Sequence, residues 1–435
     1  MSFGPTVPSP ARLRPRSTRR AFLLATLLLP ACNLGVRTTA STPPVTPTTR
    51  AASPTTAPVA LPPTPTAFPA TPPLSPAPPT PTATPAPTPS GPVELRVETV
   101  VGGLEAPWEV AFAPDGRLLL TERPGRVRLV RDGQLVPEPV LTLPVAATGE
   151  AGLLGLALHP DFPTTPWVYL YYTYSEGDRL WNRVVRCTAM GDRLVDPVVV
   201  IDRIPGATIH DGGRIAFGPD GKLYVTTGDA REPTAAQDLN SLAGKILRLE
   251  PDGSVPADNP FPGSPVWSYG HRNPQGLAWT SDGRLYATEH GPTGDLGLAA
   301  HDEVNAIEPG RNYGWPFVVG TLVRQALPDA VPPVIESGTA TWAPSGATFV
   351  RSGRIPQWQG NLLFAGLRSQ TLWRLVLSPD GRSAELLEPL YRGEFGRLRT
   401  VVEGPDGALY LLTSNRDGRG SPRRGDDRLL RIAPQ

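Results

Sequence analysis

The residues after position 92 show short apolar runs rather than a helical period. Runs of Val, Leu, Tyr, Ala and Phe are bounded by glycines and by Asp-Gly pairs. Short apolar runs between turn residues are typical of β-strands, and Asp-Gly favours a tight hairpin because it tolerates positive φ. The pattern therefore predicts an all-β domain over residues 93–435.

One strand–turn–strand pattern recurs along this domain. Clean copies, each with Asp-Gly between two apolar runs, occupy 110–121, 215–226, 277–288 and 401–413, and degenerate copies occupy 153–173 and 347–365. A further strand follows most copies, as at 125–130 and 244–249. A repeat of about 50 residues with four strands is typical of a propeller blade. The sequence thus predicts a six-bladed β-propeller of four-stranded antiparallel blades.

The two ends of the domain are left over from this repeat. Residues 93–101 form an apolar run without a blade of their own, and 428–433 end the last blade. Pairing these segments in one blade would close the ring and protect its edges. We therefore expect the domain's first and last strands to lie side by side.

Residues 1–32 have the layout of an export signal. Arginines at 12, 14, 16, 19 and 20 precede an apolar run over 21–29, which is too short to span a bilayer of about 30 Å. Residues 17–23 resemble a twin-arginine signal, and 29–32 resemble a lipobox ending in Cys32, although Pro30 is unusual there. We expect export to the periplasm or cell surface with a lipid anchor on Cys32. A plain cleaved signal is the alternative.

Residues 33–92 are predicted to be a disordered linker. From 41 to 92 the chain consists almost entirely of Pro, Thr, Ala and Ser, which cannot bury enough apolar surface to fold. The proline content favours an extended spacer between anchor and domain. An unremarkable disordered linker is the alternative.

Charge and cysteine content exclude several functions. The net charge of +1 gives no electrostatic basis for binding nucleic acid, so membrane contact is expected only through the lipid anchor. If Cys32 is lipidated, Cys187 has no partner for an intramolecular disulfide. The chain has no Cys-x-x-Cys-His haem motif, so electrons from any redox reaction must pass to a separate acceptor.

His210 is the first candidate for catalysis among five histidines. It precedes the first strand of the third repeat, on a loop that a propeller would place at the channel mouth. An imidazole titrates near neutral pH and can accept a hydroxyl proton. Asp229, at the end of a strand in the same blade, could fix its tautomer. His159 is expected to be structural, while His290 and His301 either orient a loop or are solvated.

The stretch 269–315 combines several polar features that strands do not need for packing. It begins with Arg272 and Asn273 and ends in a loop over 289–303 rich in Gly, Pro and carboxylates. Arg368, Arg397 and Arg399 recur near corresponding blade edges, although each arginine alone could be a solvated charge. Together they predict a cationic bowl for a multiply carboxylated ligand, with oxygen ligands for a hard cation nearby.

From about 95 to 433 the chain resembles the soluble, PQQ-dependent aldose sugar dehydrogenases of the glucose/sorbosone dehydrogenase group. The stretches that carry the resemblance are GLLG (152–155), GHRNPQG (270–276), EHGP (289–292), DEVN (302–305) and NYGWP (312–316). The resemblance implies a six-bladed propeller that binds pyrroloquinoline quinone (PQQ) and calcium at its mouth.

The resemblance also implies roles for individual residues. His210 would be the general base, with Asp229 as its partner, and Arg272 and Asn273 would contact the reactive side of the quinone. The other implied cofactor contacts are Arg368, Arg397 and Arg399 to the carboxylates, Trp342 against the ring, and Glu150, which stands where some relatives have glutamine. The implied calcium ligands are the carbonyls of Gly291 and Pro292 and, for a second ion, Glu303 and the carbonyl of Tyr313.

The expected function is oxidation of aldose sugars at the anomeric carbon to lactones, with hydride transfer to PQQ and reoxidation by an external acceptor. A calcium-dependent propeller lactonase is the alternative enzyme, but it would need acidic and amide ligands rather than arginines in the channel. An inert surface-binding propeller is a third interpretation. This interpretation does not explain why the candidate base, the arginines and the candidate metal-binding loop occur together.

Overall fold

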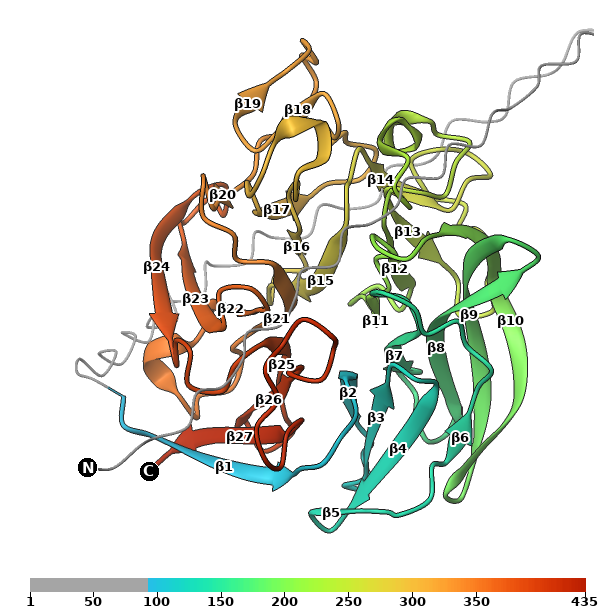
Figure 1. Cartoon of the computed structure of the whole chain (residues 1–435), viewed down its shortest axis with the longest axis vertical. Coiled ribbons are helices and arrows are strands. Elements are labelled where there is room, and N and C mark those ends of the chain that lie inside the picture. Colours follow the sequence, from blue (N-terminus) through green and yellow to red (C-terminus); the bar gives the residue numbers. More distant parts are fainter. Residues whose placement is uncertain (1–92) are drawn as a thin grey trace, which may run out of the picture. The chain divides into compact units, whose positions relative to one another are not determined.

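The computed structural model describes residues 93–435, which form six sheets around a central channel (Figure 1). The predicted signal and linker, residues 1–92, lie outside the described residues. Within 93–435 none of the helices combines the length and apolar character needed to cross a bilayer.

Each blade is an antiparallel sheet. Blade one contains β2 (Pro107–Phe112), β3 (Leu118–Glu122), β4 (Arg126–Arg131) and β5 (Gln134–Leu135), and β6 (Leu141–Thr142) also pairs with β4. Blade two contains β7 (Leu153–Leu158), β8 (Trp167–Glu176), β9 (Arg179–Met190) and β10 (Arg193–Gly206). Blade three contains β11 (Ile215–Phe217), β12 (Leu223–Thr227), β13 (Lys245–Leu249) and β14 (Val266–Tyr269).

The other three blades repeat this order. Blade four contains β15 (Pro274–Trp279), β16 (Leu285–Glu289), β17 (Glu303–Ile307) and β20 (Ile335–Glu336), with a hairpin of β18 (Val318–Val319) and β19 (Leu322–Val323). Blade five contains β21 (Pro344–Phe349), β22 (Leu362–Gly366), β23 (Thr371–Leu377) and β24 (Ala384–Leu390). Blade six contains β25 (Leu398–Glu403), β26 (Leu409–Thr413), β27 (Leu429–Pro434) and β1 (Leu95–Val101). Within the described residues, three short 3-10 turns are η1 (Pro233–Gln237), η2 (Asp295–Gly297) and η3 (Pro356–Trp358).

The predicted six-bladed architecture is confirmed. The clean repeats are the first two strands of blades one, three, four and six, and each Asp-Gly pair lies in the turn that joins them. The glycines of these four turns have φ between 72° and 88°, the region that glycine enters without steric cost. The two degenerate repeats form the same strands in blades two and five.

The predicted closure of the ring is also confirmed. Strand β1 pairs with β27, with Leu95 opposite Pro434 and Thr99 opposite Leu430. The first and last strands of the domain thus complete blade six, so the ring is closed at this point.

Apolar faces of neighbouring blades pack against one another and hold the channel in place. Between blades one and two, for example, Leu129, Leu153 and Val168 share one buried cluster. Because the strands alternate in direction, the loops before each first strand and those after each second strand emerge at the same end of the channel. This end, called the mouth below, carries 207–214, 228–244, 290–302 and 414–428.

Candidate active site

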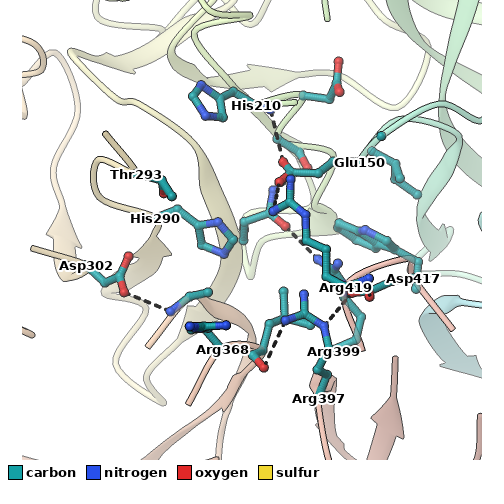
Figure 2. A pocket seen from close by; sticks show the side chains of 18 of the residues that line it. Glu150, His210, His290, Thr293, Asp302, Arg368, Arg397, Arg399, Asp417 and Arg419 are labelled. Carbon is teal, nitrogen blue, oxygen red and sulfur yellow. Dashed lines mark hydrogen bonds and ion pairs between the residues drawn. The ribbon is translucent and has the colours of Figure 1, made fainter. Parts of the chain in front are cut away.

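A cavity of about 400 Å³ opens at the mouth, and nearly all of the blades contribute to its wall (Figure 2). This volume lies within the range of small-molecule sites, about 300–1,000 Å³. Its lining includes His210, Asp211, Glu150, Arg272, Gln275, His290, Asp302 and Trp108, and the arginines at 123, 368, 397, 399 and 419.

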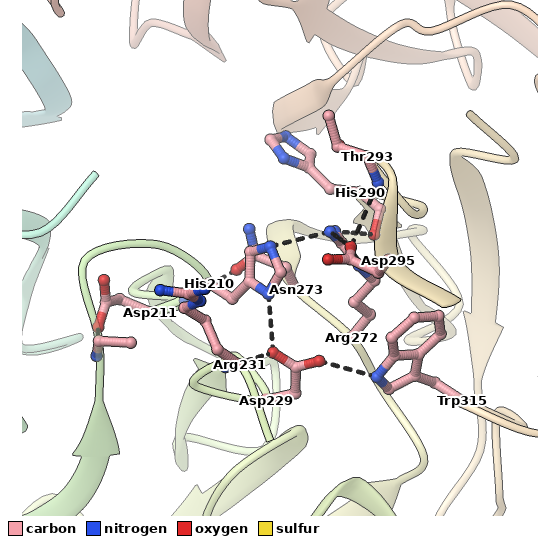
Figure 3. A network of polar contacts seen from close by, with 12 residues as sticks. His210, Asp211, Asp229, Arg231, Arg272, Asn273, His290, Thr293, Asp295 and Trp315 are labelled. Atoms are coloured by element: carbon pink, nitrogen blue, oxygen red, sulfur yellow. Dashed lines mark hydrogen bonds and ion pairs between the residues drawn. The ribbon is translucent and has the colours of Figure 1, made fainter. Parts of the chain in front are cut away.

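His210 and Asp229 form a buried pair at one side of this cavity (Figure 3). The Nδ1 of His210 lies 2.8 Å from Oδ1 of Asp229. Gly228 allows this approach, because a Cβ at that position would lie 1.8 Å from the carbonyl oxygen of His210. His210 has φ +65°, a left-handed conformation that is uncommon for non-glycine residues and is concentrated at functional sites. The loop therefore holds the imidazole against Asp229, and His210 adopts an unfavourable left-handed backbone conformation to do so.

Asp229 is held from two sides, and this defines the protonation of the pair. Its Oδ1 also accepts a hydrogen bond from the backbone N–H of Arg231 at 2.9 Å, and its Oδ2 accepts one from Nε1 of Trp315 at 2.9 Å. Both oxygens of Asp229 act as hydrogen-bond acceptors. The Nδ1 atom of the imidazole that faces this carboxylate must therefore carry the proton and donate it. The lone pair of Nε2 is consequently available on the other side of the ring.

Arg272 lies on that other side of His210. One of its terminal nitrogens is 2.8 Å from His210 Nε2, and its guanidinium also pairs with Asp295 and donates to the carbonyl of His290 at 3.2 Å. The carbon Cζ of this guanidinium lies 5.5 Å from the indole ring of Trp315. Trp315 thus contacts both Asp229 and Arg272, and a ligand that reaches Nε2 must share or displace one arginine N–H.

Three lining residues carry a buried polar atom without a hydrogen-bond partner among the described residues. They are Oδ2 of Asp211, Nε2 of His290 and Nε of Arg399. Buried polar groups in proteins are nearly always paired, so orphans around one cavity indicate that a polar ligand or water completes them. Burial lowers the pKa of His290 to about 3, so its ring is neutral in this site.

The cavity is rich in positive charge. Six arginines line it against four carboxylates, and Arg397 already pairs with Asp417 at 2.8 Å. Within 93–435 Arg399 has no carboxylate partner; it donates to Gln275 Oε1 at 3.0 Å, and its Cζ lies 5.5 Å from the ring of Trp108. Burial lowers the pKa of Arg399 to about 10, which still leaves it cationic at neutral pH. An anionic ligand would relieve the desolvation of this unpaired charge.

Glu150 lies between the base and the positive wall. Its carboxylate accepts a hydrogen bond from the backbone N–H of His210 at 3.2 Å and pairs with Arg419 at 2.7 Å. The negative charge that glutamic acid introduces here is therefore offset by an arginine from blade six.

Other predicted residues separate into those that reach the cavity and those that do not. Arg368 lines it from the turn between β22 and β23. Asn273 is buried beside the cavity, and its Oδ1 accepts a hydrogen bond from the backbone N–H of Gly212 at 3.0 Å. Trp342 is not among the lining residues of 93–435; its indole packs against Phe364 and Trp373 in blade five, and its neighbours in sequence face the cavity instead.

The predicted calcium ligands surround a second, much smaller cavity of about 10 Å³, enough for one small ion or water. Gly291, Pro292, Glu303 and Tyr313 all line it. Among the described residues the carbonyls of Gly291 and Tyr313 accept no backbone hydrogen bond, while that of Pro292 accepts one from Ala300 at 2.9 Å. No cluster of three or more metal-binding side chains occurs within 93–435, so backbone oxygens would have to complete the ligands of a cation here.

Several residues of the site were not predicted from the sequence. Trp108, Arg123 and Arg419 line the cavity from blades one and six, where no motif pointed to them. Trp315 belongs to a stretch that was noticed, but its contact with Asp229 depends on a loop fold that spacing does not reveal. The signal available for the arginines was only their position on loops at the mouth.

The burial of the Asp211 carboxyl can be tested through the dependence of protein stability on pH. Burial raises the pKa of Asp211 to about 7, against an unfolded value of about 4, so ionisation favours the unfolded state progressively from pH 4 to 7 and by a constant amount above that. Its Oδ1 accepts two hydrogen bonds that an asparagine can keep, from Asn182 and Ala207, both at 3.0 Å. We expect Asp211→Asn to raise Tm by about 3 °C or more at pH 8 and by much less at pH 4.

Thermal unfolding across pH 4–8 measures this difference. Asp115→Asn is the control of opposite sign, because the hydrogen bond from Arg117 holds the pKa of Asp115 below its usual value. A Tm difference for Asp211→Asn that does not change with pH would show that Asp211 is already ionised in the folded protein.

Comparison with known proteins decides the family. Residues 104–431 match the family model described as Glucose / Sorbosone dehydrogenase. The chain belongs to the glucose/sorbosone dehydrogenase family.

Several known proteins are similar to this chain over most of its length. Aldose sugar dehydrogenase YliI of Escherichia coli K12 is 32% identical over 370 residues, which are 80% of this chain and 95% of the relative. Quinoprotein glucose dehydrogenase B of Acinetobacter calcoaceticus is 30% identical over 411 residues, which are 73% of this chain and 84% of the relative. The PQQ-bound aldose sugar dehydrogenase of Streptomyces coelicolor is 40% identical, with TM-score 0.69 over 80% of this chain and 100% of that one.

Proposed function

We propose that this chain is a quinoprotein dehydrogenase that oxidises aldose sugars at the anomeric carbon to lactones, with PQQ as the hydride acceptor. The observation that carries the proposal is the His210–Asp229 pair, whose Nε2 side faces an arginine-rich cavity of small-molecule size. Its membership of the glucose/sorbosone dehydrogenase family and its likeness to a PQQ-bound structure support it.

The residues of the cavity fit the quinone. A multiply carboxylated ligand matches the surplus of arginines, and Arg399 in particular lacks an anionic partner within 93–435. The unpartnered Nε of Arg399 offers a hydrogen-bond donor to such a ligand, and His290 Nε2 a further polar group. We assign Arg368, Arg397 and Arg399 to its carboxylates, and Arg272 and Asn273 to its reactive side.

When bound, PQQ would supply a two-electron acceptor for the hydride of C1, and calcium would supply a Lewis acid beside it. His210 Nε2 takes the proton from the anomeric hydroxyl in the same reaction. Asp229 keeps Nδ1 protonated, orients the ring and stabilises the imidazolium that results. The hydroxyl displaces Arg272 from Nε2, and the freed N–H of Arg272 is then directed at developing negative charge. Asp295 and the carbonyl of His290 hold the rest of the guanidinium in place.

Calcium fits the small cavity beside Arg272. Hard cations prefer oxygen ligands, and the carbonyl oxygens of Gly291 and Tyr313 accept no backbone hydrogen bond from elsewhere in 93–435. Glu303 faces Glu289 across β16 and β17, a like-charge pair that a cation would stabilise. Because this cavity has room for one small ion, we assign it to the calcium that acts with the quinone, with the carbonyls of Gly291 and Pro292 as ligands. A second ion bound by Glu303 and the carbonyl of Tyr313 would require the cavity to widen.

Export and electron transfer complete the proposal. The basic and apolar segment before Cys32 supports export and a lipid anchor on that cysteine. Because the chain carries no haem attachment motif, an external acceptor must reoxidise the cofactor. The arginine-rich lining is the opposite of the acidic ligand set that a calcium-dependent lactonase would require, so that alternative is not favoured.

Reconstitution tests the proposed function. Purified protein loaded with PQQ and calcium should reduce an artificial dye in the presence of glucose or other aldoses, whereas protein stripped with a chelator and then loaded with PQQ alone should not. Protein loaded with PQQ and magnesium serves as the control for a general cation effect. Absence of dye reduction with every aldose in a panel of hexoses, pentoses and disaccharides would contradict it.

A further inference from the structure

A second large cavity, of about 480 Å³, lies at the mouth beside the first. Its wall comes from the β8–β9 hairpin of blade two, from the loop that enters blade three, and from the loop between β12 and β13. Its lining includes Trp181, Thr208, Arg231, Glu232, Asp178 and Arg179. Nothing in the proposed oxidation of a simple aldose uses this cavity.

The two cavities share one wall. Thr208 lines the second cavity, whereas His210, two residues later on the same loop, lines the first. Asp229 also lines the second cavity while it holds the imidazole of His210 at 2.8 Å. The second cavity therefore lies directly behind the loop and the carboxylate that hold His210 in place.

The chemistry of this second lining differs from that of the first. Asp178, Arg179, Arg231 and Glu232 are exposed, and among the described residues none of their side chains forms an ion pair. The third carboxylate of the lining, Asp229, is already held by His210, Trp315 and the backbone of Arg231. The two arginines therefore balance the two remaining carboxylates, so neither an anion nor a cation is favoured. A neutral polyhydroxylated ligand can use both the donors and the acceptors.

Trp181 adds an apolar surface to these polar groups. It is half-buried at the start of β9, with the guanidinium of Arg203 at 5.4 Å from its ring. Arg203 lies over one face of the indole, so the opposite face is the one that provides contact area at low entropic cost. On the opposite wall, Ala230 and Arg231 both have positive φ, at 51° and 67°, and the backbone of Arg231 is fixed by Asp229. Consecutive left-handed non-glycine residues indicate a wall that is held in shape.

We propose that this cavity is a subsite for oligosaccharides, which binds the glycosyl units that follow the reducing-end sugar. The inference rests on the proposed function, because it places the reducing end at His210. Trp181 provides the platform for a sugar ring, and Arg231 and Glu232 donate to and accept from its hydroxyls. The enzyme accordingly prefers aldoses of two or more units over glucose.

Steady-state kinetics of the reconstituted holoenzyme on maltotriose, cellotriose and glucose tests the subsite. For Trp181→Ala we expect kcat/KM on at least one trisaccharide to fall about tenfold relative to glucose. Trp167→Ala is the matched control, since Trp167 is also half-buried in blade two beneath an arginine, with Arg186 at 3.9 Å, but lies at the far end of β8. The control should leave the ratio of trisaccharide to glucose unchanged.

A second variant and a second readout keep the test decisive if Trp181→Ala is poorly folded. Glu232→Ala changes an exposed side chain, and the same ratio should fall about fivefold through the loss of one or two hydrogen bonds. Titration of the cofactor-free protein with trisaccharide, followed by tryptophan fluorescence, should show saturable binding that Glu232→Ala weakens. Unchanged ratios in both variants would overturn the subsite. Absence of turnover on all sugars with intact trisaccharide binding would instead contradict the proposed oxidation.

Discussion

His210→Ala should lower kcat on glucose by about 100- to 10,000-fold, the range that a positioned general base contributes. The variant loses the group placed to take the proton at Nε2. The other histidine of the lining does not duplicate it, because burial lowers the pKa of His290 to about 3 and makes it a poor proton acceptor. The affinity for PQQ should change little, because the arginines that bind its carboxylates lie on blades five and six.

Asp229→Asn separates positioning from proton transfer. It keeps the size of the side chain but presents an amide to the imidazole, which favours the wrong tautomer. We expect a loss of kcat nearly as large as that for His210→Ala, with KM for glucose changed less. Stopped-flow measurement of dye reduction with saturating cofactor reports both variants. If His210→Ala oxidises glucose at the wild-type rate, His210 is not the base.

Arg399→Met should weaken PQQ binding by about 10- to 100-fold while leaving the cofactor-free protein at least as stable as wild type. A buried charge-assisted hydrogen bond contributes about 1.5–3 kcal/mol to binding. In the cofactor-free state the same guanidinium is buried without a carboxylate from 93–435, so its removal relieves a desolvation cost. The two effects have opposite signs, which a generally damaged fold would not produce.

Equilibrium titration with PQQ and thermal unfolding of the cofactor-free protein measure these two quantities. Arg248→Met is the matched control, because Arg248 is similarly buried on β13 but pairs with Asp220 and Asp258 away from the cavity. It should lower Tm and leave the PQQ dissociation constant unchanged. If Arg399→Met binds PQQ like wild type, the carboxylates of the cofactor lie elsewhere.

The fold could be predicted because its signals are local and repeated. Each Asp-Gly turn specifies its own hairpin, and six hairpins with similar spacing, four of them marked in this way, leave few architectures other than a propeller. The pairing of β1 with β27 followed from the one strand left without a blade. These inferences required no knowledge of side-chain direction.

The direction of a site residue was easiest to predict where the residue lies close to a strand end. Arg272 and Asn273 immediately precede β15, and Arg399 lies on β25, so the architecture alone brings them to the mouth. Trp342 lies on a loop before β21, where the loop turns its indole into blade five and leaves its neighbours facing the cavity. Arg123 and Arg419 lie on loops that are not part of the repeated strand–turn–strand pattern. The sequence therefore contained no signal that their side chains point into the cavity.

Anaerobic addition of glucose to protein reconstituted with stoichiometric PQQ and calcium tests the central claim most directly. The absorption spectrum of the bound cofactor should convert fully to that of its reduced form, with one lactone produced for each cofactor bound. His210→Ala, which retains the cofactor, should show the oxidised spectrum for far longer. A wild-type spectrum that stays oxidised with every aldose, while PQQ is bound, would contradict the assignment of this propeller as a sugar dehydrogenase.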